Sequence, residues 1–576
     1  MDETFFSCES RLAVFVAGVF NSLPGVPGDF AARVAPTADR RFGDFQCNDA
    51  LALGKLLGQP PRKIAEAAVA GMHPLPHMLA RVEIAGPGFV NLTLADAWLA
   101  EQAQRLDTLP LCGIPQTGNG QTVVMDYSSP NVAKPMHIGH IRSTIIGAAL
   151  DRIHRALGFR VIADNHLGDW GTQFGIIIKG FREFADPAAL ETSPIGELER
   201  VYIASHQRSK DDPAWLDACR AELVKLQRGD PENLALWKRF VDLSLAEFDR
   251  VYKRLGVSFD LHRGESFYNE KLPGVMARLE AAGLVEESDG AQVVRLDGEG
   301  LPLCIVRKRD GGFNYATTDI ATVFSRQEEF APSRVVYVTD ERQQLHFKQF
   351  FAVCKKLGAT APLEHVWFGL MRLPEGVFST REGNVIKLEA LLDEAERRAR
   401  AILDESSPDM PGAEKTALAR DIGIGAVKYA DLSHDPRNTI TFTWDRALAL
   451  EGNSGPYLQY ACARISSLLA KYAEAVPGRD PAQNEWRVGN PHERALGLEL
   501  LRFPQVVLRA AEVCKPSVLA DYLYGLSQAY STFYQNSPVL KSEPSTRDSR
   551  VRLCAMVLRV LKQGLELLGI ATPERI

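Results

Sequence analysis

The stretch DYSSPNVAKPMHIGHIRS, residues 126–143, decides the fold, because it joins a predicted strand to a predicted helix. The apolar run at residues 123–125 just before it is typical of a buried parallel strand. After it, apolar residues recur at helical spacing at Ile141, Ile145, Ile146, Ala149, Ile153 and Leu157. In an open α/β sheet, ligands bind where a strand ends and a helix begins, and this stretch lies at such a junction.

Strands alternate with helices on the carboxyl side of this stretch. The segments predicted as strands are FRVIADN (159–165), RVVYVT (334–339) and HVWFGL (365–370), with a helix over 341–357. This alternation predicts a doubly wound parallel sheet of the Rossmann type in residues 121–415. The charged residues 180–260 read as a helical insertion in that sheet.

Two further blocks flank the predicted sheet. Residues 1–110 begin with helical periodicity and end in RVEIAGPGFVNLTL, a strand, turn and strand, which indicates a small N-terminal α/β domain. Residues 416–576 show helical periodicity almost throughout and are predicted to form an all-α helical bundle. The expected fold class is therefore α/β followed by α.

The composition is that of an ordinary globular protein. With 576 residues, 45% hydrophobic and 24% charged, the chain is not collagen-like, disordered or a disulfide scaffold. Its 66 basic and 72 acidic residues give a net charge of −6, which excludes a surface that is strongly basic as a whole. Binding of nucleic acid at discrete patches is still compatible with this sum, because phosphate contacts depend on local placement.

The cysteines and the amino-terminal segment bear on the cellular compartment. None of the nine cysteines is at C-x-x-C spacing, so we expect reduced, buried thiols and no zinc ribbon. The chain starts with acidic residues where a signal peptide would carry basic ones. No apolar run approaches the roughly 20 residues that cross a bilayer. We therefore expect a cytoplasmic protein without a membrane partner.

His137 and His140 lie one helical turn apart at the predicted start of the helix. Their imidazole N–H groups, together with free backbone N–H groups, can bind a polyphosphate. Gly139 would let a flat base pack against the backbone, and Lys134 is close by. The alternatives are a packing pair or part of a metal site. The strand–loop–helix context favours the phosphate interpretation.

The motif H-I-G-H after a strand resembles the first signature of class I aminoacyl-tRNA synthetases. The longer string SSPNVAKPMHIGHIRSTIIG, with NHLGDWGTQFG at 165–175, is similar to arginyl-tRNA synthetases in particular. Further matching segments are YADLSHDPRN (429–438), EGNSGPYLQYACAR (451–464), YSTFYQNSPVL (530–540) and the ending LLGIATPERI. The resemblance covers all three blocks. It implies ATP-dependent activation of L-arginine to arginyl-adenylate and transfer to the 3′-terminal ribose of tRNA(Arg), with release of AMP and pyrophosphate.

The second signature of this class is a K-M-S-K-S loop, and the matching segment here is GVFSTREGNVIKL at 376–388. It keeps Ser379, Thr380 and Arg381, but Val377 stands where the first lysine would be. In the family, the lysine before H-I-G-H is thought to compensate, which implies a phosphate role for Lys134; a solvated loop lysine is the alternative. Whether Lys134 or Arg381 carries most of the transition-state charge stays open. The catalytic residues that the resemblance implies are Lys134, His137, Gly139, His140, Ser379, Thr380 and Arg381.

An arginine substrate presents five N–H donors and a permanent positive charge, so a selective pocket needs carboxylates and neutral acceptors. The arginine-binding positions that the resemblance implies are Asn131, Glu265, Tyr315, Asp319 and Gln343. Tyr315 and Asp319 are four apart and share a face if this segment is helical. Gln344 is the alternative to Gln343.

The implied mechanism needs no protein nucleophile, because the arginine carboxylate attacks the α-phosphate of ATP. Catalysis then comes from positioning and from stabilising negative charge on the phosphates. The sequence shows no dedicated cage of carboxylates for a metal. We expect Mg²⁺ to arrive with ATP, and we expect no metal site of the protein's own and no tightly bound cofactor.

The outer blocks are implied to hold tRNA. Phe89 and Asn91 match a pair that reads a base at the tRNA elbow, and the alternative is a core Phe with a turn Asn. Tyr460, Arg464 and Tyr534 match anticodon-contacting positions; without the resemblance, both tyrosines would be read as packing residues. The implied partners are tRNA(Arg), L-arginine and ATP, and the implied state is a monomer.

Two other functions compete with this one. A nucleotidylyltransferase would share H-x-G-H but would not need the helical bundle. A non-catalytic, synthetase-like RNA-binding protein would keep the outer blocks and lose the active site. The intact His137, Gly139, His140, Glu265 and Asp319 argue against the second alternative, for which only the altered loop near Ser379 leaves room.

Overall fold

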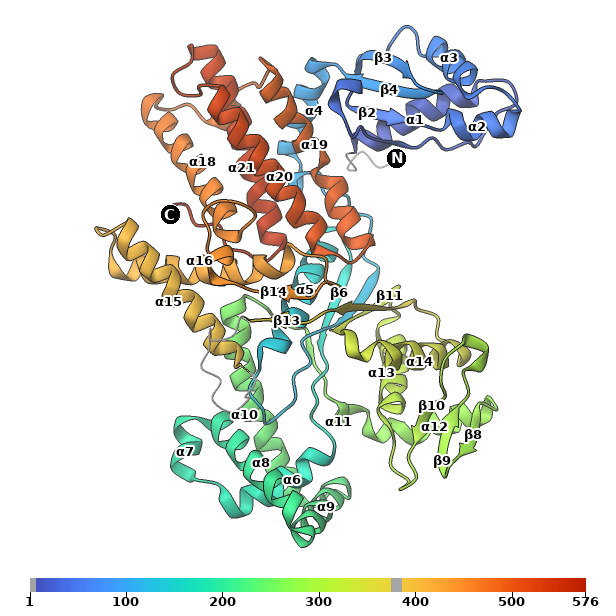
Figure 1. The fold of residues 1–576 in the computed structure, drawn as a ribbon, viewed down its shortest axis with the longest axis vertical. Coiled ribbons are helices and arrows are strands. Elements are labelled where there is room, and N and C mark those ends of the chain that lie inside the picture. Colours follow the sequence, from blue (N-terminus) through green and yellow to red (C-terminus); the bar gives the residue numbers. More distant parts are fainter. Residues whose placement is uncertain (1–6, 374–385) are drawn as a thin grey trace.

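A five-stranded parallel sheet lies at the centre of the computed structural model, which describes residues 7–373 and 386–576 (Figure 1). Its strands are β5 (Thr122–Asp126), β6 (Arg160–Asn165), β7 (Leu261–His262), β11 (Arg334–Asp340) and β12 (Leu363–Phe368). The strand order is β12-β11-β5-β6-β7, with the first strand, β5, in the middle. The chain adds β6 and β7 on one side of β5 and then β11 and β12 on the other, which is the doubly wound arrangement. The predicted Rossmann-type sheet is confirmed.

The unit β5–α5–β6 forms around the stretch that decides the fold. Val123, Val124 and Met125 of β5 are at most 1% exposed, as expected for a strand covered on both faces. Helix α5 (Ile138–Ala156) follows the signature and is buried along most of its length. The start of α5 therefore lies beside the carboxyl ends of β5 and β6.

The insertion between β6 and β7 is helical, as predicted. It consists of α6 (Thr172–Phe184), α7 (Pro187–Thr192), α8 (Pro194–Asp211), α9 (Pro213–Gln227) and α10 (Pro231–Leu255), which form the lower lobe in Figure 1. Helices α7, α9 and α10 each begin with proline directly after an aspartate whose side chain accepts a backbone N–H of the first turn. The Asp-Pro pairs therefore set these boundaries.

A second lobe lies between β7 and β12 and contains an antiparallel sheet that the sequence analysis did not predict. It holds β8 (Val285–Ser288), β9 (Ala291–Val294) and β10 (Cys304–Arg307), with α11 (Glu265–Tyr268), α12 (Leu272–Ala281), α13 (Tyr315–Phe330) and α14 (Gln344–Lys356). The three strands have four residues each, and the sequence of β8 is VEES. Strands of four residues are too short to show a clear hydrophobic periodicity.

The amino-terminal block is a small α/β domain, as predicted. Its antiparallel sheet has the order β1-β2-β4-β3, with β1 (Val34–Pro36), β2 (Phe45–Cys47), β3 (Leu79–Ala85) and β4 (Phe89–Leu94). The helices of this part of the chain are α1 (Cys8–Asn21), α2 (Ala50–Leu57), α3 (Pro61–Gly71) and α4 (Asp96–Thr108). Helix α4 leads out of the domain and packs against α19 of the bundle (Figure 1).

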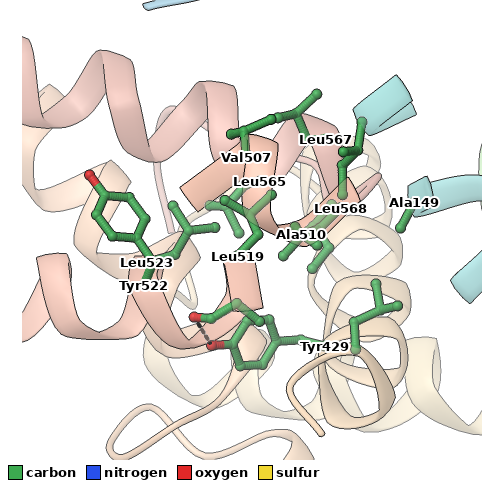
Figure 2. Close-up of a cluster of buried hydrophobic side chains, with 14 of the residues drawn as sticks. Ala149, Tyr429, Val507, Ala510, Leu519, Tyr522, Leu523, Leu565, Leu567 and Leu568 are labelled. Atoms are coloured by element: carbon green, nitrogen blue, oxygen red, sulfur yellow. Dashed lines mark hydrogen bonds between the residues drawn. The ribbon is translucent and has the colours of Figure 1, made fainter. Parts of the chain in front are cut away.

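The carboxyl-terminal part is helical, as predicted. It contains α15 (Leu388–Ser406), α16 (Gly412–Leu432), α17 (Trp444–Ala447), α18 (Gly455–Ala475), α19 (Pro491–Glu512), α20 (Pro516–Asn536) and α21 (Pro544–Leu567). The short strands β13 (Met371–Arg372) and β14 (Ile440–Thr441) pair in parallel beside α5. Figure 2 shows Leu519, Leu523 and Leu565 packed together, with Ala149 of α5 at the edge of the same cluster. The bundle core therefore continues onto the helix that carries the signature.

All nine cysteines are free and buried, which confirms the expected reduced thiols. In the described ranges no helix combines the length and the apolar character needed to cross a bilayer.

A buried ion pair joins α5 to α16. Arg142 and Asp431 are each 1% exposed, and the Arg142 Nε and Nη2 atoms lie 3.0 Å from the Asp431 carboxylate oxygens. The Arg142 Nη1 atom donates to the carbonyls of Gly369, at 2.6 Å, and Asn438, at 2.9 Å. Three parts of the chain that are distant in sequence, around residues 142, 369 and 431–438, therefore meet at one guanidinium group.

Replacing Arg142 by Met should lower the free energy of unfolding by roughly 3–5 kcal/mol, because the Asp431 carboxylate stays buried without a counter-charge. The double variant Arg142→Met/Asp431→Leu should recover part of that loss, since it removes both charges. Urea denaturation followed by circular dichroism measures both changes. Equal stability of the single variant and the wild type would contradict this role for the pair.

Candidate active site

The loop that carries the signature is tied to the ends of two sheet strands. Arg326 of α13 is fully buried, and its Nη2 atom lies 2.6 Å from Asp126 Oδ2 and 2.8 Å from Asp164 Oδ2. Ser129 then donates its Oγ–H to Asp126 Oδ1, at 3.1 Å, and its backbone N–H to Asn165 Oδ1, at 3.0 Å. The ends of β5 and β6 therefore hold the start of the loop in place.

His137 and His140 cap the amino terminus of α5 with their side chains. His137 Nδ1 accepts the backbone N–H of Gly139, and His140 Nδ1 accepts the backbone N–H of His137, both at 3.0 Å. The two rings stack with their centroids 3.8 Å apart. A Cβ at Gly139 would lie 2.7 Å from His137 Cε1, so glycine is what allows this close approach.

The environment keeps both histidines neutral. Burial, followed by the charges of Arg342 and Lys134, lowers the pKa of His137. Burial and the neighbouring His137 lower the pKa of His140 to about 3. Because each Nδ1 accepts a backbone N–H, the proton of each neutral ring must be on Nε2. The start of α5 therefore presents two imidazole N–H donors beside a helix amino terminus, which is suited to phosphate oxygens.

Lys134 and the segment that follows the second signature lie next to these histidines. The half-buried Lys134 Nζ is 4.4 Å from the centroid of the Tyr202 ring in α8, and burial lowers the pKa of Lys134. The backbone N–H of Ile138 donates to Ile386 O at 3.0 Å, and that of Leu388 donates to Met136 O at 2.9 Å. The end of segment 376–388 is thus paired with the first signature. The predicted Ser379, Thr380 and Arg381 lie outside the described residues.

A pair of carboxylates forms the acidic part of the site. Burial, then the charges of Asp319 and Asp169, raise the pKa of Glu265 to about 8. Asp169 accepts the backbone N–H of Ser266 at 2.8 Å and its Oγ–H at 2.6 Å, which fixes the start of α11. A Cβ at Gly264 would lie 2.1 Å from Asp169 Cγ, so this turn requires glycine. The charges that act on Glu265 are both negative, and the site is therefore suited to a cation.

The other residues predicted to bind arginine come from neighbouring segments. The exposed Asn131 forms a backbone bridge with Gly168, next to Asp169. Tyr315 begins α13, which is the helix of Asp319, and it is 66% exposed. Gln343 is exposed at the end of the turn Glu341–Gln343, directly before α14, and the alternative Gln344 is half-buried. The Asp319 charge acts on Glu265, so these two carboxylates share one electrostatic environment. Asn131 is bridged to Gly168 beside Asp169, Tyr315 shares α13 with Asp319, and Gln343 directly precedes α14.

The three residues predicted to contact the anticodon line one cavity in the bundle. Tyr460 and Arg464 of α18 and Tyr534 of α20 surround about 480 Å³, together with the carboxyl-terminal residues 574–576. The Arg464 guanidinium lies 4.4 Å from the centroid of the Tyr534 ring. The exposed Tyr460 ring lies at the same cavity. This arrangement offers aromatic faces and a cation for a nucleic-acid base.

The two residues predicted to read a base at the tRNA elbow are less accessible than the predicted anticodon contacts. Phe89 and Asn91 are both in β4, two residues apart. Phe89 is half-buried, whereas Asn91 is 3% exposed and its Oδ1 accepts Gln46 Nε2 at 2.7 Å. A base would therefore reach the Asn91 amide only after Gln46 had moved.

Family comparisons cover the three blocks. The family model "tRNA synthetases class I (R), catalytic domain" matches residues 110–444. The models "DALR anticodon binding domain" and "Arginyl tRNA synthetase N terminal domain" match residues 458–576 and 14–94. A relative from Fusobacterium nucleatum named arginine–tRNA ligase is 45% identical over 539 residues, which are 93% of this chain and 94% of the relative. The chain belongs to the arginyl-tRNA synthetase family.

Other relatives and solved structures agree with this family. The arginine–tRNA ligase of Erwinia tasmaniensis is 44% identical, with 96% of this chain and 97% of the relative covered. The arginyl-tRNA synthetase structures from Plasmodium falciparum and Thermus thermophilus match with TM-scores of 0.84 and 0.83 at 26% identity. Each comparison covers 99% of this chain and 100% of the other. The match of an anticodon-binding model to the bundle excludes the nucleotidylyltransferase alternative.

The sequence analysis missed the residues that support the site in this member of the family. Asp126 and Asp164 lie at the ends of β5 and β6, and Arg326 forms an ion pair with each. His346 of α14 lies 2.6 Å from Asp319 through its Nε2 atom. An acidic residue at the end of each predicted buried strand was the one available signal, and it identifies neither Arg326 nor His346.

Proposed function

We propose that this chain carries out the reaction of its family, the ATP-dependent attachment of L-arginine to tRNA(Arg). Arginine and ATP would give arginyl-adenylate and pyrophosphate, and the arginyl group would then pass to the 3′-terminal ribose with release of AMP. The observation that carries the proposal is the pair Glu265 of α11 and Asp319 of α13, an acidic site in the same domain as the histidines that cap α5. A cationic amino acid and a polyphosphate need these two opposite environments.

In this proposal, Glu265 and Asp319 receive the guanidinium group of arginine. Carboxylates are its strongest acceptors, because charge-assisted bonds to a planar fork combine charge and geometry. Asn131, Tyr315 and Gln343 would complete the ligand set as neutral partners. Glu265 must ionise to bind the cation, so the free energy of binding includes the release of its proton.

His137 and His140 would donate their Nε2–H groups to phosphate oxygens of ATP, with Lys134 and the predicted Arg381 supplying full charges. Ser379 and Thr380 belong to the same predicted loop. The arginine carboxylate attacks the α-phosphate in line, and these donors stabilise the charge that develops on the phosphate oxygens. Since the pKa of His140 is about 3, this donor keeps the same protonation state throughout the physiological range.

We propose that Mg²⁺ arrives with the nucleotide, so that MgATP is the substrate. No tightly bound cofactor enters the proposal.

The outer blocks would bind tRNA in this proposal. The cavity of Tyr460, Arg464 and Tyr534 is of a size to accept an unstacked base, and Phe89 with Asn91 would contact the elbow. The functional limits 1–110, 121–415 and 416–576 stay predictions. A monomeric state and a cytoplasmic location also stay predictions.

The direct test of this function is charging of tRNA(Arg) with labelled arginine, run beside arginine-dependent pyrophosphate exchange with and without tRNA. We expect charging, and we expect exchange only when tRNA is present, because the family generally needs tRNA for activation. A non-cognate tRNA serves as the control for charging.

No charging of cognate tRNA would refute the function and would favour the non-catalytic alternative. Exchange at full rate without tRNA would refute only the requirement for tRNA.

Arginine affinity should rise with pH up to about 8 and then level off, since the pKa of Glu265 is raised to about 8 and its ionised form binds the cation. Below pH 8 the affinity should fall by up to about tenfold for each pH unit. Titration calorimetry between pH 6 and 8.5, in buffers of different ionisation enthalpy, measures the affinity and the released proton.

The variant Glu265→Gln should bind arginine weakly and without this pH dependence. Glu270→Gln changes an exposed carboxylate five residues away and is the matched control, which should behave like the wild type. An affinity that does not change between pH 6 and 8, with no dependence on the buffer, would contradict the role of Glu265.

A further inference from the structure

His346 is the described side chain whose ring nitrogen contacts a carboxylate of the acidic pair. Its Nε2 atom lies 2.6 Å from Asp319 Oδ2. Both side chains are partly exposed, so the contact lies at the wall of the site and not in the core. The charge of this same Asp319 carboxylate contributes to the raised pKa of Glu265.

Packing fixes the imidazole of His346 before any substrate is present. Its ring centroid lies 5.2 Å from that of Phe350 and 5.8 Å from that of Phe347, and both phenylalanines are buried. Phe347 in turn stacks on His365 at 4.1 Å, and His365 Nε2 is bonded to Thr339 Oγ1 at 2.7 Å. The ring of His346 therefore packs directly on Phe347 and Phe350, whereas His365 contacts Phe347.

A hydrogen bond at one oxygen sets the plane of the Asp319 carboxylate. The terminal torsion of an aspartate is broad when nothing holds it, whereas a guanidinium needs its acceptors in a defined plane. With Oδ2 bonded to His346, Oδ1 is the oxygen that can face a ligand. An arginine or lysine in place of His346 would also orient the carboxylate, but its permanent charge would compete with the cationic substrate.

We propose that His346 is a positioning residue for arginine selection, which holds the Asp319 carboxylate in the plane that receives the guanidinium group. This inference rests on the proposed role of Asp319 in binding arginine. His346 contacts neither substrate in this account and acts only through Asp319. Its effect should therefore appear in the binding of arginine and not in the binding of ATP.

Two substitutions separate the hydrogen bond from the packing. His346→Phe removes the Nε2–H donor and keeps an aromatic ring in the cluster. His346→Gln restores an N–H donor near the position of Nε2. His365→Gln is the matched control, because it removes a histidine from the same cluster without touching Asp319.

Charging kinetics with the intact chain and tRNA(Arg) give the readout. For His346→Phe we expect the KM for arginine to rise about tenfold or more, because the variant loses one hydrogen bond to a charged group. The kcat of this variant and its KM for ATP should each stay within about twofold of the wild-type values. His346→Gln should recover most of the lost affinity, and His365→Gln should leave the KM for arginine unchanged.

Asp319→Asn distinguishes a failure of this inference from a failure of the proposed site. If Asp319→Asn charges tRNA like the wild type, the assignment of Asp319 itself is wrong. If Asp319→Asn is impaired while His346→Phe matches the wild type, only the positioning role is wrong. The double variant His346→Phe/Asp319→Asn should have a KM for arginine no higher than that of Asp319→Asn alone, because both changes remove the same interaction.

Three other outcomes would overturn the inference. One is an equal rise in the KM for arginine and the KM for ATP in His346→Phe. Another is a similar defect in His365→Gln, which would assign the effect to packing. The third is a failure of His346→Gln to recover affinity while its thermal melting matches the wild type.

Discussion

The position of α5 depends on the buried ion pair between Arg142 and Asp431. Arg142 is two positions after His140, so the helix that presents the histidines is held from its buried face by α16. The same guanidinium binds the Gly369 and Asn438 carbonyls, next to the paired strands β13 and β14. Charges this deeply buried separate only at a high cost in free energy. The amino-terminal end of α5 is therefore fixed relative to the helical bundle as well as to the sheet.

Burial shifts the pKa values of the two parts of the site in opposite directions. It lowers the pKa of His140 to about 3, so that the imidazole stays a neutral N–H donor for an anion. It raises the pKa of Glu265 to about 8, because burial and two nearby carboxylates disfavour the charged form. A bound guanidinium would supply the missing counter-charge. Without a cation, Glu265 is thus mostly protonated at neutral pH, and the guanidinium group that we propose as its ligand would favour the ionised form.

The sequence predicted the parts of the fold that follow from local patterns. The strand, loop and helix around residues 126–143 were readable because apolar periodicity and the histidine motif are contiguous. Arg326 and Arg142 were not readable, because their partners are 200 and 289 residues away in the chain. The sheet β8–β10 was missed because its strands have only four residues each. The burial of Asn91 behind Gln46 depends on pairing between β2 and β4. The family resemblance supplied Glu265 and Asp319, but not the histidine that orients one of them.

The central claim is that the Glu265–Asp319 pair receives the guanidinium group, and a crystal structure of the chain with L-arginine bound tests it most directly. The account predicts guanidinium nitrogens about 2.7–2.9 Å from Glu265 and from Asp319 Oδ1. His346 Nε2 should still be bonded to Asp319 Oδ2 in that structure. An arginine side chain that contacts neither carboxylate, or that displaces His346 from Asp319, would contradict the account.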